Sequence, residues 1–175
     1  MKQLGAKGVK WLKGAHLILA GGWLGAAVCM LLVLNVKSAA PSDGQQLFAF
    51  NSAVKLIDDF IVIPCALGSL VTGLLYSLFT AWGFFRHRWL TVKWAVTVSA
   101  ILFGTFFLGP WVNEFTAISG ALGLEALGDG RYIEARRLNN TFGMIQVAVL
   151  IVTMFISVLK PWKKKSASRT TGSGN

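Results

Sequence analysis

Four long runs of apolar residues without a charged side chain constrain this 175-residue chain more than any other feature. They cover residues 14–36, 60–85, 94–113 and 138–159, with histidine counted as neutral. About 20 such residues form a helix long enough to cross the hydrocarbon core of a bilayer. The runs are continuously apolar rather than alternating, which favours helices over the strands of a membrane barrel. The sequence therefore predicts an all-α, integral membrane, antiparallel four-helix bundle over residues 1–162.

The composition of the two ends of the chain predicts an uncleaved first span and a disordered tail. The first apolar run is longer than the roughly 7–15 residues of a cleavable signal peptide, and we expect it to remain as a span. Residues 163–175 are polar, basic and rich in Ser, Thr and Gly. Such a composition cannot bury enough apolar surface to fold, so we expect a disordered basic cytoplasmic tail.

The charged residues divide unequally between the two sides of the predicted membrane. The termini and the loop between the second and third spans hold 12 of the 17 Lys and Arg residues and none of the seven acids. The positive-inside rule places both termini in the cytoplasm. The net charge of +10 then indicates attraction to a bilayer with anionic head groups and no nucleic-acid partner.

Small residues recur every fourth position in the first two spans, where they allow close helix approach. At a rise of about 1.5 Å per residue, the antiparallel spans bring such residues to matching depths. The predicted layers are Gly21–Gly73, Gly25–Ser69 and Cys29–Cys65. The fourth span has few small residues, and we expect it to be peripheral and lipid-facing.

Two sets of side chains are candidate metal or cofactor ligands. Cys29 and Cys65, with the thioethers of Met30 and Met144 at similar depth, are compatible with a disulfide or with Cu(I). The alternative is that both cysteines pack as small hydrophobic residues. His16 lies inside the first span and is a candidate haem or metal ligand or proton carrier, because a histidine in a membrane needs a polar partner.

Acidic residues mark the opposite side of the membrane. Asp58 and Asp59 open the second span and Glu114 follows the third, which is compatible with an outer vestibule for cations or protons. The alternative is that they form ion pairs across the outer loops with arginines at positions 131, 136 and 137.

Pro64 and the Gly109-Pro110 pair are expected to kink or end helices. No nucleophile–base set or phosphate loop is recognisable, so no enzymatic activity is expected.

Three segments carry a resemblance to a known family: "WLKGAHLILAGGWLGA", "IDDFIVIPCALGSLVTGLLYSLFTAWGFFRHRWLTVKW" and "GTFFLGPWVN". They resemble a bacterial family of four-span predicted integral membrane proteins of unknown function, which implies the bacterial plasma membrane. The Lys, His, Trp and Gly pattern of "LKGAHLILAGGWLG" resembles the copper-resistance D-type membrane domain. That second resemblance, carried by His16, Trp23 and Gly25, implies copper or haem handling, for which His16 with Cys29 or Cys65 are the candidate ligands in this chain.

The functional expectation is a multi-pass inner-membrane protein without a cofactor. It would act as a membrane accessory or a small-solute transport unit, either as a homo-oligomer or with a membrane protein partner. The alternative is a copper- or haem-associated membrane protein.

Overall fold

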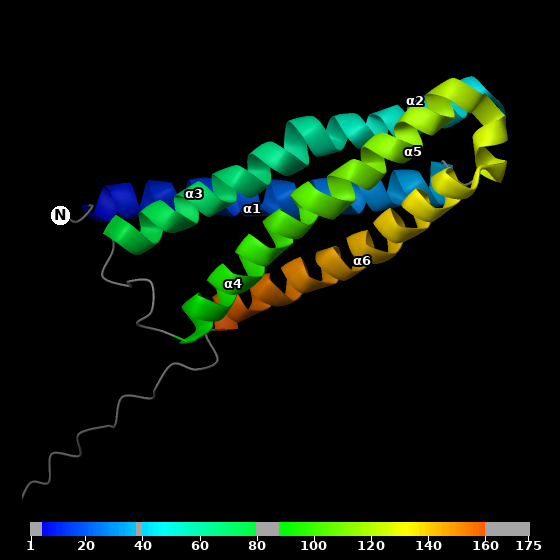
Figure 1. Cartoon of the computed structure of the whole chain (residues 1–175). Helices are drawn as coiled ribbons and strands as arrows, with labels where there is room; N and C mark the ends of the chain where they lie inside the picture. Colours follow the sequence, from blue (N-terminus) through cyan, green and yellow to red (C-terminus); the bar gives the residue numbers. More distant parts are fainter. Residues whose placement is uncertain (1–4, 38–39, 80–87, 160–175) are drawn as a thin grey trace, which may run out of the picture.

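The computed structural model describes residues 5–37, 40–79 and 88–159, and it is all-α. Helix α1 (Ala6–Leu32) continues into the π-helical turn η1 (Val33–Lys37). Two long composite helices and a final helix follow (Figure 1): α2 (Gly44–Ile57) with η2 (Asp58–Val62) and α3 (Ile63–Phe79), then α4 (Arg88–Phe103) with η3 (Gly104–Leu108) and α5 (Gly109–Leu122), a 3-10 helix η4 (Gly123–Gly128), and α6 (Gly130–Leu159).

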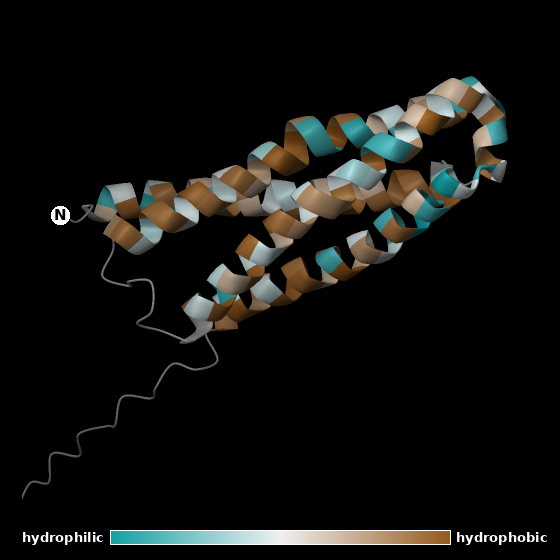
Figure 2. Cartoon of the chain, viewed as in Figure 1, coloured by the Kyte–Doolittle hydropathy of each residue, from teal (hydrophilic) through white to brown (hydrophobic). Residues whose placement is uncertain are grey.

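Four helical stretches of the described residues are long and apolar enough to cross a membrane, namely Ala6–Val36, Gly44–Phe79, Leu90–Gly128 and Gly130–Leu159. Their large apolar side chains mostly face outward: Ile18 and Val158 are 76% and 77% exposed. Figure 2 shows hydrophobic residues along much of the helix length, with hydrophilic residues gathered mainly where α2, α5 and the start of α6 meet. A helical bundle with apolar residues on its outer surface indicates a membrane protein.

The helices extend well beyond the predicted spans. The second helix begins 16 residues before position 60, because Asp43 caps it: its carboxylate accepts the Gln46 N–H at 2.8 Å, and Gln46 Oε1 accepts the Ser42 N–H at 2.7 Å. The fourth begins at Gly130, where Asp129 accepts the Tyr132 N–H at 2.9 Å. Residues 80–85 of the predicted second span and the predicted tail at 163–175 lie outside the described residues.

Pro64 and Pro110 do not end their helices, and each follows a π-helical turn. Pro64 comes two residues after η2, and Pro110 comes two residues after η3. A proline ring clashes with the carbonyl four residues earlier and cannot donate a hydrogen bond to it. The π turns absorb this: the Ile63 N–H reaches back five residues to Asp58 O, and the Gly109 N–H reaches back to Gly104 O.

One end of the bundle is tightly packed, and we call it the closed end. It is defined by the buried side chains Leu34, Leu47, Val54, Val112, Phe115, Ala126, Tyr132 and Ala135. Two glycines bring α2 against the end of α5 there. A Cβ at Gly44 would lie 2.8 Å from the Gly123 Cα, and Gly123 has a φ of +57°, which favours glycine.

The fourth span is an integral member of the bundle, and the prediction that it is peripheral is wrong. Helix α6 packs against α1, α4 and α5. Phe142 of α6 joins an aromatic cluster with Phe103 and Trp111, at ring distances of 5.3 and 5.8 Å. Aromatic side chains hold α6 against its neighbours, as small residues do in other spans. The scarcity of small residues in this span therefore does not indicate that it is peripheral.

Toward the other end, the pair α1–α3 and the pair α4–α6 diverge (Figure 1). The N-terminal part of α1, the last turns of α3 and α6 and the first turns of α4 all lie at this end, which we call the open end.

Candidate functional site

A cavity of about 350 Å³ lies between the diverging helix pairs at the open end. Its volume falls within the range of roughly 300–1,000 Å³ that is typical of small-molecule sites. All four spans contribute to its lining, which consists of Lys13, His16, Leu17, Ser69, Leu70, Gly73, Tyr76, Ser77, Leu90, Lys93, Trp94, Thr97, Ser157 and Val158. The mixture of hydroxyls, three basic side chains and aliphatic groups makes it the strongest candidate site.

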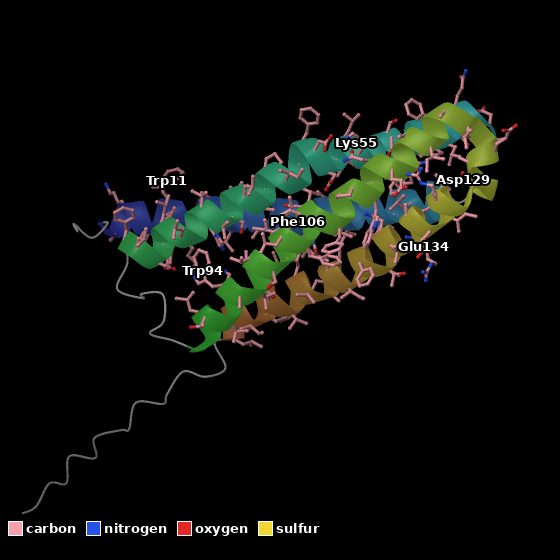
Figure 3. The ribbon with its side chains drawn as sticks, in the orientation of Figure 1. Trp11, Lys55, Trp94, Phe106, Asp129 and Glu134 are labelled. Carbon is pink, nitrogen blue, oxygen red and sulfur yellow. The ribbon has the colours of Figure 1, made fainter. Side chains whose placement is uncertain are left out.

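His16 occupies the wall of this cavity because α3 leaves room for its ring. A Cβ at Gly73 would lie 3.6 Å from His16 Cε1 and 4.0 Å from Trp94 Cζ2. Gly73 therefore lies between side chains of α1 and α4. Trp94 extends from α4 into the space between the two helix pairs (Figure 3), and its indole N–H donates to Ser77 Oγ at 3.3 Å.

A directed chain of hydrogen bonds connects α3, α1 and α4. The Thr72 hydroxyl donates to the carbonyl of Gly68 at 2.7 Å, so Thr72 Oγ1 can accept from His16 Nδ1 at 2.9 Å. His16 Nε2 lies 3.2 Å from Lys93 Nζ. An ammonium has only donors, so Nε2 must be the acceptor. The network thus assigns His16 as a neutral imidazole with its proton on Nδ1.

Lys93 has no acidic side chain to neutralise it. All seven acids of the chain lie at positions 43–59 or 114–134, and none occurs in residues 60–113 or 135–175. The segments that form the cavity, in α1, α3, α4 and the end of α6, therefore contain no carboxylate side chain. Lys13 adds a second ammonium at the same cavity. The site has an excess of positive charge that this chain's own side chains do not balance.

A second cavity, of about 290 Å³, lies at the closed end. It is lined by Leu34, Asn35, Leu127, Tyr132, Ile133, Arg136, Arg137 and Asn140. Its basic groups already have acceptors: Arg136 donates to Leu34 O at 2.6 Å, and Arg137 forms an ion pair with Glu134 at 2.8 Å. Asn35 and Asn140 exchange amide hydrogen bonds at 2.7 and 3.1 Å. These contacts give it a structural role, and the open-end cavity is the better ligand site.

The predicted packing layers of α1 and α3 are wrong in both face and register. Gly21 and Gly25 are exposed, and a Cβ at either would meet nothing within 4 Å. The neighbouring stripe faces α3 instead: a Cβ at Gly22 would lie 2.9 Å from Cys65 Sγ, and Ala26 is buried. Gly73, which we expected opposite Gly21, lies at His16.

The physical reason is that the predicted register depended on Phe60 as the outer edge of the second span. The helix instead begins at Gly44, so the apolar run does not mark its end. Trp23 also contributes, because it is only 3% exposed and occupies the bundle interior. Burying this large side chain turns Gly21 and Gly25 outward. Ser69 is buried as expected, but it lines the cavity.

The candidate metal ligands are not brought together. Cys65 faces Gly22, whereas Cys29 is exposed and lies seven residues, about 10 Å, farther along α1. Both are free thiols. Met144 is exposed, and Met30 packs against the closed-end core. Within the described ranges, no three His, Cys, Asp or Glu side chains form a group that could hold a metal ion.

Among the three carboxylates of the predicted outer vestibule, Glu114 forms an ion pair between helices, and Asp59 forms one within its own helix. Glu114 pairs with Arg131 at 2.6 Å, as the ion-pair alternative predicted. Asp59 pairs with Lys55 at 2.8 Å, and Lys55 also donates to Asn113 at 2.6 Å. Asp58 lies half-buried in the π turn η2. None of the three carboxylates lines either cavity described above.

The sequence reading missed Lys93 and Thr72. Lys93 bounds an uncharged run, which predicts a place in the loop, yet α4 begins five residues earlier, at Arg88. The available signal was the apolar segment Trp89-Leu90 before it, which extends a helical pattern across the lysine. Thr72 carries no sequence signal that sets it apart from the other residues of this span.

No protein-family model, curated protein or solved structure matches this chain. The two family resemblances drawn from the sequence therefore stay predictions.

Proposed function

We propose that this chain is a bacterial plasma-membrane protein, with both termini in the cytoplasm, that binds a small anionic ligand in the open-end cavity. It acts by binding or moving this ligand and performs no reaction on it. The observation that carries the proposal is the Lys93 ammonium, which lines a cavity built by all four spans and has no acidic side chain of this chain beside it.

A charged group inside a membrane bundle is costly unless it is paired. Lys93 has a neutral acceptor in His16 Nε2 at 3.2 Å, which satisfies one donor but leaves the charge uncompensated. An entering phosphate or carboxylate would accept charge-assisted hydrogen bonds from Lys93. Hydroxyls of Ser69, Ser77 and Tyr76 line the same space and can position the remaining oxygens.

Binding is better supported than catalysis by the state of His16. A general base needs a free lone pair within reach of the proton that it removes. The free lone pair of this imidazole, on Nε2, is already directed at the Lys93 ammonium. The same contact gives little support to the copper or haem alternative, and neither cysteine is among the cavity-lining residues.

Titration of the purified full-length protein with inorganic phosphate, and separately with benzoate, tests the proposal by calorimetry or thermal shift. We expect saturable binding that Lys93→Gln weakens about tenfold or more, since a charge-assisted contact contributes roughly 1.5–3 kcal/mol. Lys10→Gln is the matched control: it removes one positive charge from an exposed position of α1 that does not line the cavity. Equal binding by both variants, or no binding of either anion, would contradict the proposal.

A further inference from the structure

We propose that the ligand of the open-end cavity is an anionic lipid, whose phosphate head group reaches Lys93 while its acyl chain leaves sideways into the bilayer between α1 and α6. This inference rests on the proposed function and names its ligand class. The shared chemistry is a phosphate oxyanion, and its source is the membrane rather than the aqueous phase.

The cavity has an apolar rim that faces outward from the bundle. Leu17 of α1 and Val158 of α6 both line it, yet they are 59% and 77% exposed. Side chains that line a cavity and also lie on the surface mark its mouth. Because both are aliphatic and lie on spanning helices, this mouth opens toward lipid.

Helices α1 and α6 are joined far from this mouth. A Cβ at Gly143 of α6 would lie 3.3 Å from Leu31 Cδ2, and the side chains of Asn35 and Asn140 are hydrogen-bonded to each other. Leu31 is 14 residues from Leu17, which corresponds to about 21 Å along the helix. Nearer the mouth, Trp23 of α1 and Leu150 of α6 belong to one buried cluster, six residues from Leu17 and eight from Val158. These contacts all lie deeper than the mouth, and the space between the two helices at the open end is lined by the cavity residues.

The lining of the cavity is itself amphipathic. Lys93, His16 and Ser77 supply polar groups, whereas Leu70, Leu90 and Val158 supply aliphatic surface. A volume of about 350 Å³ corresponds to on the order of ten water molecules at about 30 Å³ each. An inorganic oxyanion is the size of only a few waters, so it would leave the aliphatic part empty. A head group with the first atoms of its chains fits both parts.

The height of the basic groups also matches a lipid head group. Lys93 lies five residues, about 8 Å, from the start of α4, and Lys13 lies about 10 Å from the start of α1. Both lysines are therefore near the end of the spans, where the polar head-group region of a bilayer begins. Leu17 lies one turn deeper than Lys13, at the level of the first chain segments. Basic residues at the ends of spans attract anionic lipids.

The test uses full-length protein freed of lipid in a neutral detergent. It is titrated in parallel with dioctanoyl phosphatidylglycerol, dioctanoyl phosphatidylcholine and inorganic phosphate, and binding is read by native mass spectrometry and thermal shift. We expect phosphatidylglycerol to bind at least tenfold more tightly than the other two probes. Lys93→Gln should remove most of the preference for phosphatidylglycerol over phosphatidylcholine, and Lys10→Gln should preserve it.

A variant at the mouth separates a lipid from a soluble ligand. Val158→Trp adds bulk at the mouth, at a side chain that is 77% exposed, and should weaken phosphatidylglycerol binding several-fold more than inorganic phosphate binding. If inorganic phosphate binds as tightly as the lipid, and only Lys93→Gln weakens it, the lipid inference is overturned and the proposed function stands. If none of the probes binds, or if Lys93→Gln and Lys10→Gln bind them with equal affinity, both the lipid inference and the proposed function are overturned.

Discussion

The two ends of this bundle solve the problem of buried polar groups in opposite ways. At the closed end, Tyr132 is 1% exposed, and its hydroxyl accepts hydrogen bonds from Asn51 at 3.2 Å and Arg136 at 3.4 Å. Nearby, Glu114 forms an ion pair with Arg131, and Glu134 forms one with Arg137. At the open end, Lys93 has an imidazole as its neighbour and no acid.

Under the proposed function, the closed end contributes stability and the open end contributes binding. A core whose polar groups are satisfied adds to the free energy of unfolding, whereas an uncompensated charge subtracts from it. A chain keeps such a charge where an external partner supplies the missing interaction.

The largest contrast is expected from the same substitution made at two points of the first helical stretch, Leu34 in η1 and Leu17 in α1. Leu34→Ala, at a side chain that is 1% exposed, should lower the free energy of unfolding by about 2–5 kcal/mol through lost packing contacts and a residual cavity. Leu17→Ala, at an exposed side chain, should cost about 0.5 kcal/mol or less. Unfolding in mixed detergent micelles measures both. Similar losses for the two variants would remove the distinction between the ends.

Next in size is a test of which face of α1 meets α3. Gly22→Leu forces a side chain against Cys65 and should destabilise the protein by about 1–3 kcal/mol. Gly25→Leu places the same side chain in open space and should have little effect. Thermal melting of the two variants in detergent compares them. The opposite order would restore the Gly21, Gly25 and Cys29 face as the packing surface.

Removing a lysine should have opposite signs at the two ends. Lys93→Met should raise the free energy of unfolding of the ligand-free protein by about 1–2 kcal/mol, because it removes an uncompensated, half-buried charge. Lys55→Met should lower it by up to about 1 kcal/mol, because it breaks the partly exposed contacts to Asp59 and Asn113. A loss of stability in Lys93→Met would show that the His16 contact fully compensates the ammonium.

The smallest expected effect concerns the hydroxyl at the centre of the closed end. Tyr132→Phe keeps the ring contact with Phe115, whose centroid is 6.4 Å away, but removes the acceptor for Asn51 and Arg136. We expect a loss of about 1 kcal/mol, measured by the same unfolding assay. No measurable loss would mean that water replaces the hydroxyl, and that this end is less dry than its burial indicates.

The sequence sufficed for the class of fold, because spanning helices are recognisable from charge and hydropathy alone. It also separated a basic side without acids from an acidic side, and this separation is the basis of the proposed site. The helix ends were less accessible, since Asp43 starts α2 well outside the apolar run. The pairing of Gly22 rather than Gly21 with α3 depends on how Trp23 is accommodated, which is a property of the packed bundle. Lys93 was misplaced because a charge inside a helix resembles the end of a span.

The two π turns before Pro64 and Pro110 have a mechanical consequence. Each interrupts the regular hydrogen-bond ladder of a long helix between the closed end and the cavity, so bending costs least at these points. We therefore expect α3 and α4 to bend at η2 and η3 relative to the closed end. When a ligand widens or narrows the cavity, the displacement should grow from these hinges toward the open end and leave the core around Tyr132 unmoved.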